Sequence, residues 1–199
     1  MADRTRVAVL ISGGGSNMAA LIEAAGAPDA PHRIVLVLSN NPEAGGLALA
    51  RASGIEAIAI DHRPFGKDRQ AHERQIHAAL EAAGVQVVAL AGYMRVLTPW
   101  LVGCWSGRML NIHPSLLPKY PGLHTHARAI EAGDSEAGCT VHLVTDGVDE
   151  GPILGQARVP VLSDDTPEAL AQRVLVAEHD LYPRLLADFC AQQNGVSRS

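Results

Sequence analysis

Short apolar runs alternate with amphipathic segments through the first half of the chain. The apolar runs predict strands at residues 7–11, 34–38, 55–60, 85–91 and 109–113, and the segments between them predict helices at residues 18–25, 46–52, 67–83 and 100–104. Runs that are apolar at nearly every position are typical of parallel strands, which are buried on both faces. The regular alternation of strand and helix therefore predicts βαβ units around a mostly parallel sheet.

The pattern changes in the second half of the chain. A helix is predicted at residues 125–132, and two apolar segments at residues 140–144 and 153–161 flank an acidic turn at residues 146–151. Because their connection is short, these two segments are expected to pair antiparallel. A final helix is expected at residues 166–189. Together the two halves predict a three-layer α/β fold, with an open, mostly parallel, Rossmann-like sheet and an antiparallel C-terminal extension.

No linker, internal repeat or low-complexity tract divides the chain. Residues 1–190 are therefore expected to form a single domain, and the polar residues 191–199 a disordered tail. The 199 residues carry a net charge of −5 and no basic block, which argues against a general affinity for nucleic acid or for an anionic membrane. Three distant cysteines, no signal-peptide core and no apolar run of about 20 residues favour a reduced, cytoplasmic protein.

A glycine-rich segment, Ser-Gly-Gly-Gly-Ser-Asn at residues 12–17, follows the first predicted strand. Glycines let a ligand approach the backbone closely, and the helix that begins after them presents free N–H groups to an anion. The segment is not a Walker A loop, because no Gly-Lys-Ser/Thr follows, and Met18 occupies the position of the third glycine in a dinucleotide fingerprint. Phosphate binding is the favoured interpretation, and a tight turn without a ligand is the alternative.

Two polar residues, Asn111 and His113, stand at the end of the fifth predicted strand. Being two residues apart, they point to the same side, opposite to Leu110 and Ile112. An amide can polarise a carbonyl oxygen, and a histidine exchanges protons near neutral pH. The strand end is therefore a candidate catalytic site; a buried, hydrogen-bonded pair without a catalytic role is the alternative.

The acidic turn at residues 146–151 could supply a proton-handling partner for His113, although the sequence leaves open which acid faces it. His113, His124, His126 and His142 also raise the alternative of a metal site, with or without Asp149. Their spacing fits neither HExxH nor a zinc cluster. No metal is therefore expected.

Five segments carry a resemblance to a known family. The longest is Asn-Ile-His-Pro-Ser-Leu-Leu-Pro-Lys-Tyr-Pro-Gly at residues 111–122. The others are the glycine segment at residues 12–17, Ala-Gly-Tyr-Met-Arg at 91–95, Asp-Glu-Gly-Pro-Ile at 149–153 and Glu-His at 178–179. Over nearly its whole length and in the same order, the chain resembles the folate-dependent formyltransferases, which implies the formyltransferase fold.

Within that family, the chain is most similar to members that use a phosphoribosyl substrate. The resemblance implies a transferase of one-carbon metabolism that moves a formyl group from 10-formyltetrahydrofolate to the amine of 5-phosphoribosylglycinamide, in de novo purine biosynthesis. Its substrates would be small molecules, with no nucleic acid, membrane or metal involved. It would be a monomer or a homodimer.

The resemblance also implies roles for individual residues. Asn111, His113 and Asp149 would be catalytic. The substrate would be bound through the backbone of Gly15, Ser16 and Asn17 at its phosphate, and through Glu178 at its ribose hydroxyls. The folate would contact Arg69, Met94, Arg95, Val96, Leu97, Asn111, Thr145, Asp146, Gly147, Val148 and Asp149.

Other functions share parts of this pattern. A formyltetrahydrofolate hydrolase would usually carry an extra N-terminal domain, and a methionyl-tRNA formyltransferase a C-terminal domain and a basic surface; neither is expected in an acidic chain of 199 residues. A non-catalytic phosphosugar-binding module would use the glycine segment without bringing Asn111, His113 and Asp149 together. The geometry of these three side chains therefore separates catalysis from binding alone.

Overall fold

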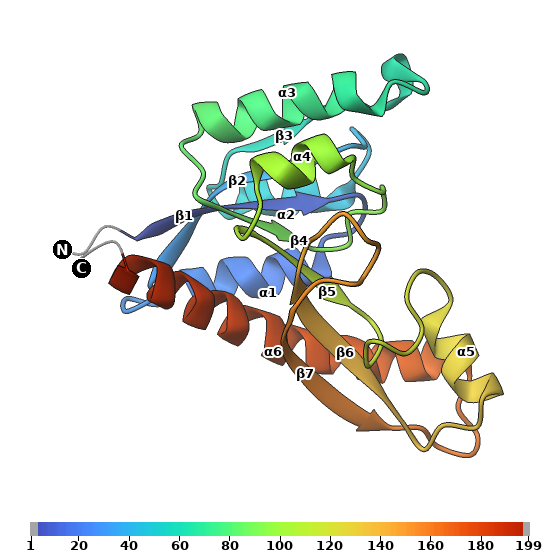
Figure 1. The fold of residues 1–199 in the computed structure, drawn as a ribbon. Helices are drawn as coiled ribbons and strands as arrows, with labels where there is room; N and C mark the ends of the chain where they lie inside the picture. The colour runs from blue at the N-terminus through green and yellow to red at the C-terminus, as the bar shows by residue number, and fades with distance from the viewer. Residues whose placement is uncertain (1–3, 197–199) are drawn as a thin grey trace.

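A seven-stranded sheet runs through the protein in the order β3-β2-β1-β4-β5-β6-β7 (Figure 1). The computed structural model describes residues 4–196. The strands are β1 (Thr5–Ile11), β2 (His32–Ser39), β3 (Ala57–Ala59), β4 (Val87–Leu90), β5 (Met109–His113), β6 (Glu136–Leu143) and β7 (Ile153–Pro160). Strands β1 to β5 are parallel, whereas β6 runs antiparallel to β5, and β7 antiparallel to β6. The predicted parallel sheet with an antiparallel extension is confirmed.

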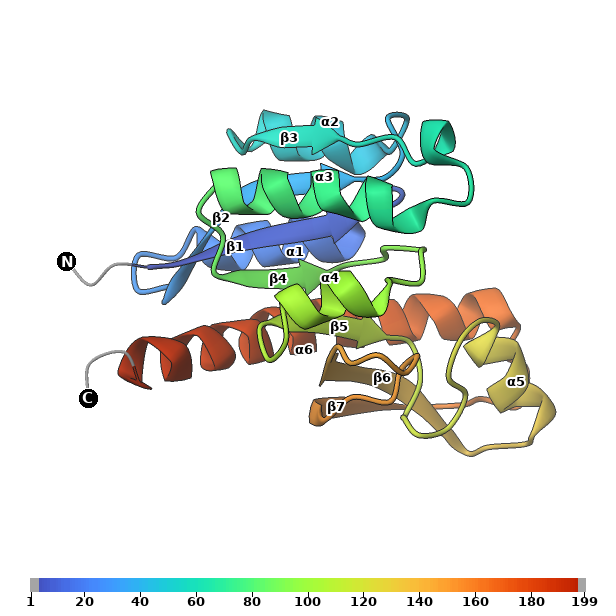
Figure 2. The ribbon, with the colours of Figure 1, turned by 45° about the horizontal axis from the view of Figure 1, so that its top comes forward.

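Helices cover both faces of this sheet. They are α1 (Ser16–Ala25), α2 (Gly45–Ala52), α3 (Arg69–Ala82), α4 (Pro99–Cys104), α5 (Thr125–Glu131) and α6 (Pro167–Val196), and a short 3-10 helix, η1 (Arg63–Phe65), precedes α3. Helices α1, α2 and α6 share one hydrophobic core with the sheet, and α3 and α4 share another on the opposite face (Figures 1 and 2). The predicted three-layer architecture is therefore confirmed.

The central strand β1 shows why the parallel strands are apolar at consecutive positions. Val7, Val9 and Ile11 pack in the core with α1 and α6, whereas Ala8 and Leu10 pack in the core with α3 and α4. All five side chains are fully buried. Because successive side chains point to opposite faces, a strand between two helical layers needs apolar residues at every position. The two cores hold the carboxyl ends of β1, β4 and β5 at one edge of the sheet.

The last helix is longer than predicted. Helix α6 ends at Val196 rather than at residue 189, so residues 191–196, which were expected to lie in a disordered tail, continue the helix. Residues 197–199 lie outside the described residues. Cys190 is buried and residues 191–193 are exposed, and the sequence of residues 191–196 has no apolar pattern. Alanine and glutamine sustain a helix without burial, which is why the apolar pattern missed its last turns.

His32, the first residue of β2, is a buried histidine with no hydrogen-bond partner for either ring nitrogen among the described residues. It is only 1% exposed. Burial, together with the positive charge of Arg4, lowers the pKa of His32 from 6.5 to about 4. The folded protein therefore keeps this ring neutral at a pH where the unfolded chain already binds a proton.

We expect the folded state to lose stability as the pH falls from 6.5 towards 4, because in that range only the unfolded chain protonates His32. The contribution of His32 should lower the free energy of unfolding by about 3 kcal/mol near pH 4. His32→Leu should remove it, measured as the difference between the free energies of urea unfolding at about pH 7 and about pH 4.5. Ile34→Val, in the same strand, should keep the wild-type difference. Equal acid sensitivity of His32→Leu and wild type would contradict this account.

Candidate active site

A cavity of about 690 Å³ opens at the carboxyl ends of β4 and β5. Its walls come from the loop after β4 (residues 92–97), residues 122–126, the loop between β6 and β7 (residues 144–149), and one face of α6. Open α/β sheets bind ligands outside the carboxyl ends of their strands, where successive loops diverge. The cavity lies at the strand end where the sequence predicted a site.

The glycine segment forms the entrance to helix α1. Gly15 has a φ of 77°, and a Cβ at this position would lie 3.0 Å from the Cα of Gly46, so the turn requires glycine. Ser16 and Asn17 begin α1, where N–H groups lack partners within the helix and suit an anion. Asn17 lines the cavity, whereas Gly15 and Ser16 are not among its lining residues.

Glu178 of α6 meets the glycine segment at the cavity wall. Its carboxylate is buried, and Oε2 accepts a hydrogen bond of 2.7 Å from Nδ2 of Asn17, a residue 161 positions away in the chain. Burial raises the pKa of Glu178, and the hydrogen bond from Asn17 partly offsets that rise. The structure therefore joins the predicted phosphate site to the predicted ribose-binding acid.

His113 ends β5 with its ring buried beside the cavity. Its Nε2 lies 2.9 Å from the carbonyl oxygen of Tyr120 in the proline-rich loop. Because a carbonyl can only accept, Nε2 carries the proton of this hydrogen bond. Nδ1 then faces Asp149, whose Oδ2 is 3.3 Å away. Asp149 is therefore an acid of the 146–151 turn that reaches His113, which the sequence alone had left open.

Asp149 is held in place by several segments. Its Oδ2 accepts a hydrogen bond of 2.8 Å from the N–H of Gly122, and its Oδ1 lies 3.7 Å from Nε2 of His142. Burial by itself would raise the pKa of Asp149, but the His142 ring, the Gly122 N–H and the charge of His113 outweigh it and lower the pKa below 3.8. Asp149 is therefore ionised at neutral pH.

The Asp149 backbone has an unusual conformation. Its φ is 57°, in the left-handed region that favours glycine. Tyr120 and His124, two residues of the loop opposite, share this conformation with φ values of 57° and 59°. Non-glycine residues in this region gather at functional sites, where the surrounding structure holds them.

His142 completes the arrangement, and the sequence did not predict it as a catalytic or binding residue. It is the direct neighbour of Asn111 in the antiparallel register of β5 and β6, and Nδ2 of Asn111 lies 3.2 Å from its Nε2. Its Nδ1 donates a hydrogen bond of 2.9 Å to the carbonyl oxygen of Leu143, so Nε2 is the ring atom that faces the Asn111 amide and the Asp149 carboxylate. The register of the two strands would have revealed this contact, but the sequence pattern does not specify it.

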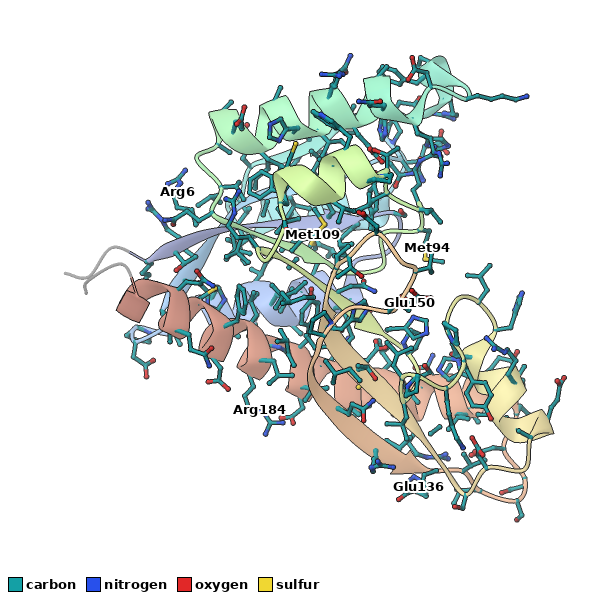
Figure 3. All side chains as sticks on the ribbon, viewed as in Figure 1. Arg6, Met94, Met109, Glu136, Glu150 and Arg184 are labelled. Carbon is teal, nitrogen blue, oxygen red and sulfur yellow. The ribbon has the colours of Figure 1, made fainter. Side chains whose placement is uncertain are left out.

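The predicted folate-binding residues fall into two groups. Ten of them line the cavity, namely Met94, Arg95, Val96, Leu97, Asn111, Thr145, Asp146, Gly147, Val148 and Asp149. Most of this group comes from two loops. Figure 3 labels Met94 in the first loop and Glu150, which follows the second loop in the sequence. Arg69 is not among the lining residues; its Nη1 donates a hydrogen bond of 3.4 Å to the carbonyl oxygen of Val96. Arg69 therefore contacts the backbone of the first loop.

Residues 4–196 contain neither a membrane-spanning helix nor a metal-binding cluster. None of the helices in this range is long and apolar enough to cross a membrane. The same range contains no group of three or more His, Cys, Asp or Glu side chains placed to hold a metal ion.

Known proteins share both the sequence and this fold. Residues 5–186 match the formyl transferase family. The phosphoribosylglycinamide formyltransferase of Escherichia coli is 44% identical over 183 residues, which cover 92% of this chain and 86% of that protein. The trifunctional purine biosynthetic protein adenosine-3 of Drosophila melanogaster is 50% identical over 186 residues, 92% of this chain, but the match spans only 14% of its length.

Solved structures agree with these relatives. The phosphoribosylglycinamide formyltransferase from Brucella melitensis has a TM-score of 0.91 and 57% identity, with 95% of this chain and 97% of that chain covered. The glycinamide ribonucleotide transformylase 1 from Symbiobacterium toebii has a TM-score of 0.92 and 43% identity, with 95% of this chain and 89% of that chain covered. Fold, sequence and the family match over most of the chain agree: the protein belongs to the formyl transferase family, among the phosphoribosylglycinamide formyltransferases.

Proposed function

We propose that this protein transfers a formyl group from 10-formyltetrahydrofolate to the amine of 5-phosphoribosylglycinamide, which gives the N-formyl product and tetrahydrofolate in de novo purine biosynthesis. One observation carries the proposal: the Asp149 carboxylate lies 3.3 Å from Nδ1 of His113, in a cavity that Asn111 also lines. A module that only binds phosphosugars needs the glycine segment alone. Acid–base chemistry needs these three side chains within reach of one another.

The cavity fits a folate-derived formyl donor. Met94, Val96 and Val148 are 68%, 57% and 51% exposed, and apolar side chains of this kind are covered when a flat heterocycle binds. The peptide groups of residues 145–149 offer hydrogen-bond donors and acceptors on the neighbouring wall. The donor supplies a formyl carbon bound to nitrogen, which the substrate amine attacks. We assign no role to a metal.

The phosphoribosyl substrate fits the wall formed by α1 and α6. In this proposal, the backbone N–H groups of Gly15, Ser16 and Asn17 bind its phosphate, and the Glu178 carboxylate accepts hydrogen bonds from its ribose hydroxyls. The hydrogen bond between Asn17 and Glu178 supports this assignment, because it joins a residue of each proposed subsite. Binding in this order along the cavity would leave the amine towards the end that Asn111 and His113 line.

Each of the three proposed catalytic side chains has a distinct task. The Asn111 amide, whose Nδ2 lies 3.2 Å from Nε2 of His142, donates an N–H to the formyl oxygen, where negative charge develops. Nε2 of His113 is engaged with Tyr120, so Nδ1 is the ring atom that exchanges a proton. Asp149 balances the charge of the imidazolium while it exists. The amine proton reaches the folate nitrogen through Nδ1 or through a water that Asp149 holds, as the bond from that nitrogen to the formyl carbon breaks.

The proposal concerns small-molecule substrates, without nucleic acid or membrane. It includes a cytoplasmic location, and a monomer or a homodimer. The nearest alternative reaction is hydrolysis of the same formyl donor, in which water takes the place of the amine.

A direct test follows deformylation of 10-formyltetrahydrofolate by absorbance, with and without 5-phosphoribosylglycinamide. We expect deformylation to depend on the nucleotide, because its amine is the attacking group. An equal rate without the nucleotide would identify a hydrolase. Absence of deformylation under both conditions would refute the proposal.

His113→Ala and Asp149→Asn should each lower kcat by about 10²-fold or more, with smaller changes in KM, since acid–base groups act mainly in the transition state. His77→Ala in α3 and Asp180→Asn on the exposed face of α6 make the same changes away from the cavity and should retain wild-type kcat. Near-normal turnover by a folded His113→Ala or Asp149→Asn enzyme would remove that residue from the mechanism.

The KM for 5-phosphoribosylglycinamide should depend on the ionisation of Glu178. Burial raises the pKa of Glu178 above 4.5, so the carboxylate is present above this raised pKa and is lost as the pH falls through it. We therefore expect KM to rise as the pH falls, and the rise should begin at a higher pH than it would with a glutamate of ordinary pKa. Glu178→Gln should have a high KM with little pH dependence. If it kept the wild-type profile of KM against pH, another group would be responsible.

A further inference from the structure

The Ser12 hydroxyl connects the two loops that the proposed function assigns to the two substrates. We call residues 13–17 the phosphate loop and residues 92–97 the folate loop. Ser12 lies between the end of β1 and the phosphate loop, and its Oγ accepts a hydrogen bond of 2.8 Å from the N–H of Met94 in the folate loop. The same hydroxyl donates a hydrogen bond of 2.6 Å to Oδ1 of Asn40, which follows β2.

Backbone hydrogen bonds add to this connection. The N–H of Ser12 donates to the carbonyl oxygen of Gly92 at 3.1 Å, and the N–H of Gly46 donates to the carbonyl oxygen of Gly13 at 3.1 Å. Asn40 is buried, so its Oδ1 depends on a protein partner. Met94 itself is 68% exposed. This end of the folate loop is therefore positioned mainly by polar contacts rather than by burial of its side chain.

The other end of the folate loop is fixed by a different side chain. Glu73 of α3 is 3% exposed, and its carboxylate accepts a hydrogen bond of 2.8 Å from the N–H of Thr98 and another from the Thr98 hydroxyl. Thr98 is the N-cap residue of α4, directly after the folate loop. In the described part of the chain, the Glu73 carboxylate bonds to Thr98 and not to the phosphate loop, so its influence should be confined to the folate side.

We propose that Ser12 is a shared positioning residue, whose hydroxyl holds the phosphate loop and the folate loop in a fixed relative position, so that both substrates depend on it. The inference rests on the proposed function, because that function makes the two loops binding sites. Loss of the hydroxyl leaves the Met94 N–H and the buried Asn40 Oδ1 without this partner, and both segments can then shift. Within residues 4–196, the hydrogen bonds of Ser12 go to Gly92, Met94 and Asn40 and none goes to Asn111, His113 or Asp149, so bound substrates should still react.

The test compares the affinities of Ser12→Ala and wild type for two probes, 5-phosphoribosylglycinamide and tetrahydrofolate, by titration calorimetry. Both dissociation constants should rise about fivefold to tenfold, the usual effect of an unpaired buried polar group. At saturating substrates, kcat should stay within about twofold of wild type. Ser12→Thr keeps the hydroxyl and should restore both affinities.

Two controls separate a shared role from general loosening. Glu73→Ala should weaken tetrahydrofolate binding alone. Ser39→Ala removes a buried hydroxyl at the end of β2, which accepts a hydrogen bond of 3.0 Å from the Asn41 N–H, and it should change neither affinity. Should Ser12→Ala not fold, Ser12→Cys provides the same comparison, because a thiol of similar size is only a weak donor and acceptor.

The outcomes are distinct. Weaker binding of both probes to Ser12→Ala, with rescue by Ser12→Thr, supports the proposal. Weaker binding of only one probe, or of neither, overturns it while the proposed function stands. A wild-type protein that binds neither probe overturns the proposed function, and this inference with it.

Discussion

A carboxylate that is largely removed from water needs partners for its charge, and the Asp149 side chain, 11% exposed, has partners from three separate segments. His113 comes from the end of β5, the N–H of Gly122 from the proline-rich loop, and His142 from β6. These segments meet because β6 returns antiparallel to β5 and places His142 opposite Asn111. The antiparallel extension therefore turns a strand-end cavity, common to open α/β sheets, into a site whose acid is held from three sides.

The contacts around the cavity are also arranged in pairs that join distant parts of the chain. Asn17 reaches Glu178 across the boundary between α1 and α6, and Ser12 reaches Met94 across the boundary between β1 and the loop after β4. In the first contact two side chains on helices meet, and in the second a serine hydroxyl beside β1 accepts from a backbone N–H of a loop. Such short connections limit how far one wall can move relative to another, which is the condition for holding two substrates in reacting geometry.

The local pattern of the sequence predicts much of this structure because apolar positions indicate which side chains are buried. Consecutive apolar positions predicted the parallel strands, and the spacing of Asn111 and His113 placed both on one side of β5. Contacts that depend on tertiary geometry are not indicated by any local pattern in the sequence. The residue pattern could not select Asp149 among the acids of its turn, which only the family resemblance named. It also could not pair Asn111 with His142, or show that Arg69 meets the Val96 backbone. It also missed the last turns of α6, because those turns have no apolar face.

The left-handed backbone of Asp149, Tyr120 and His124 has a consequence for how this protein can change. A non-glycine residue in this conformation costs about 1 kcal/mol or more relative to glycine. Glycine at position 149 would remove that local cost but also the carboxylate, whereas glycine at position 120 would keep the carbonyl that accepts from His113 and give its backbone more freedom. Under the proposed mechanism, selection for thermal stability and selection for turnover therefore favour different residues at position 149. A library screened by melting temperature alone would drift away from aspartate at the position to which the proposed mechanism assigns the charge partner of His113.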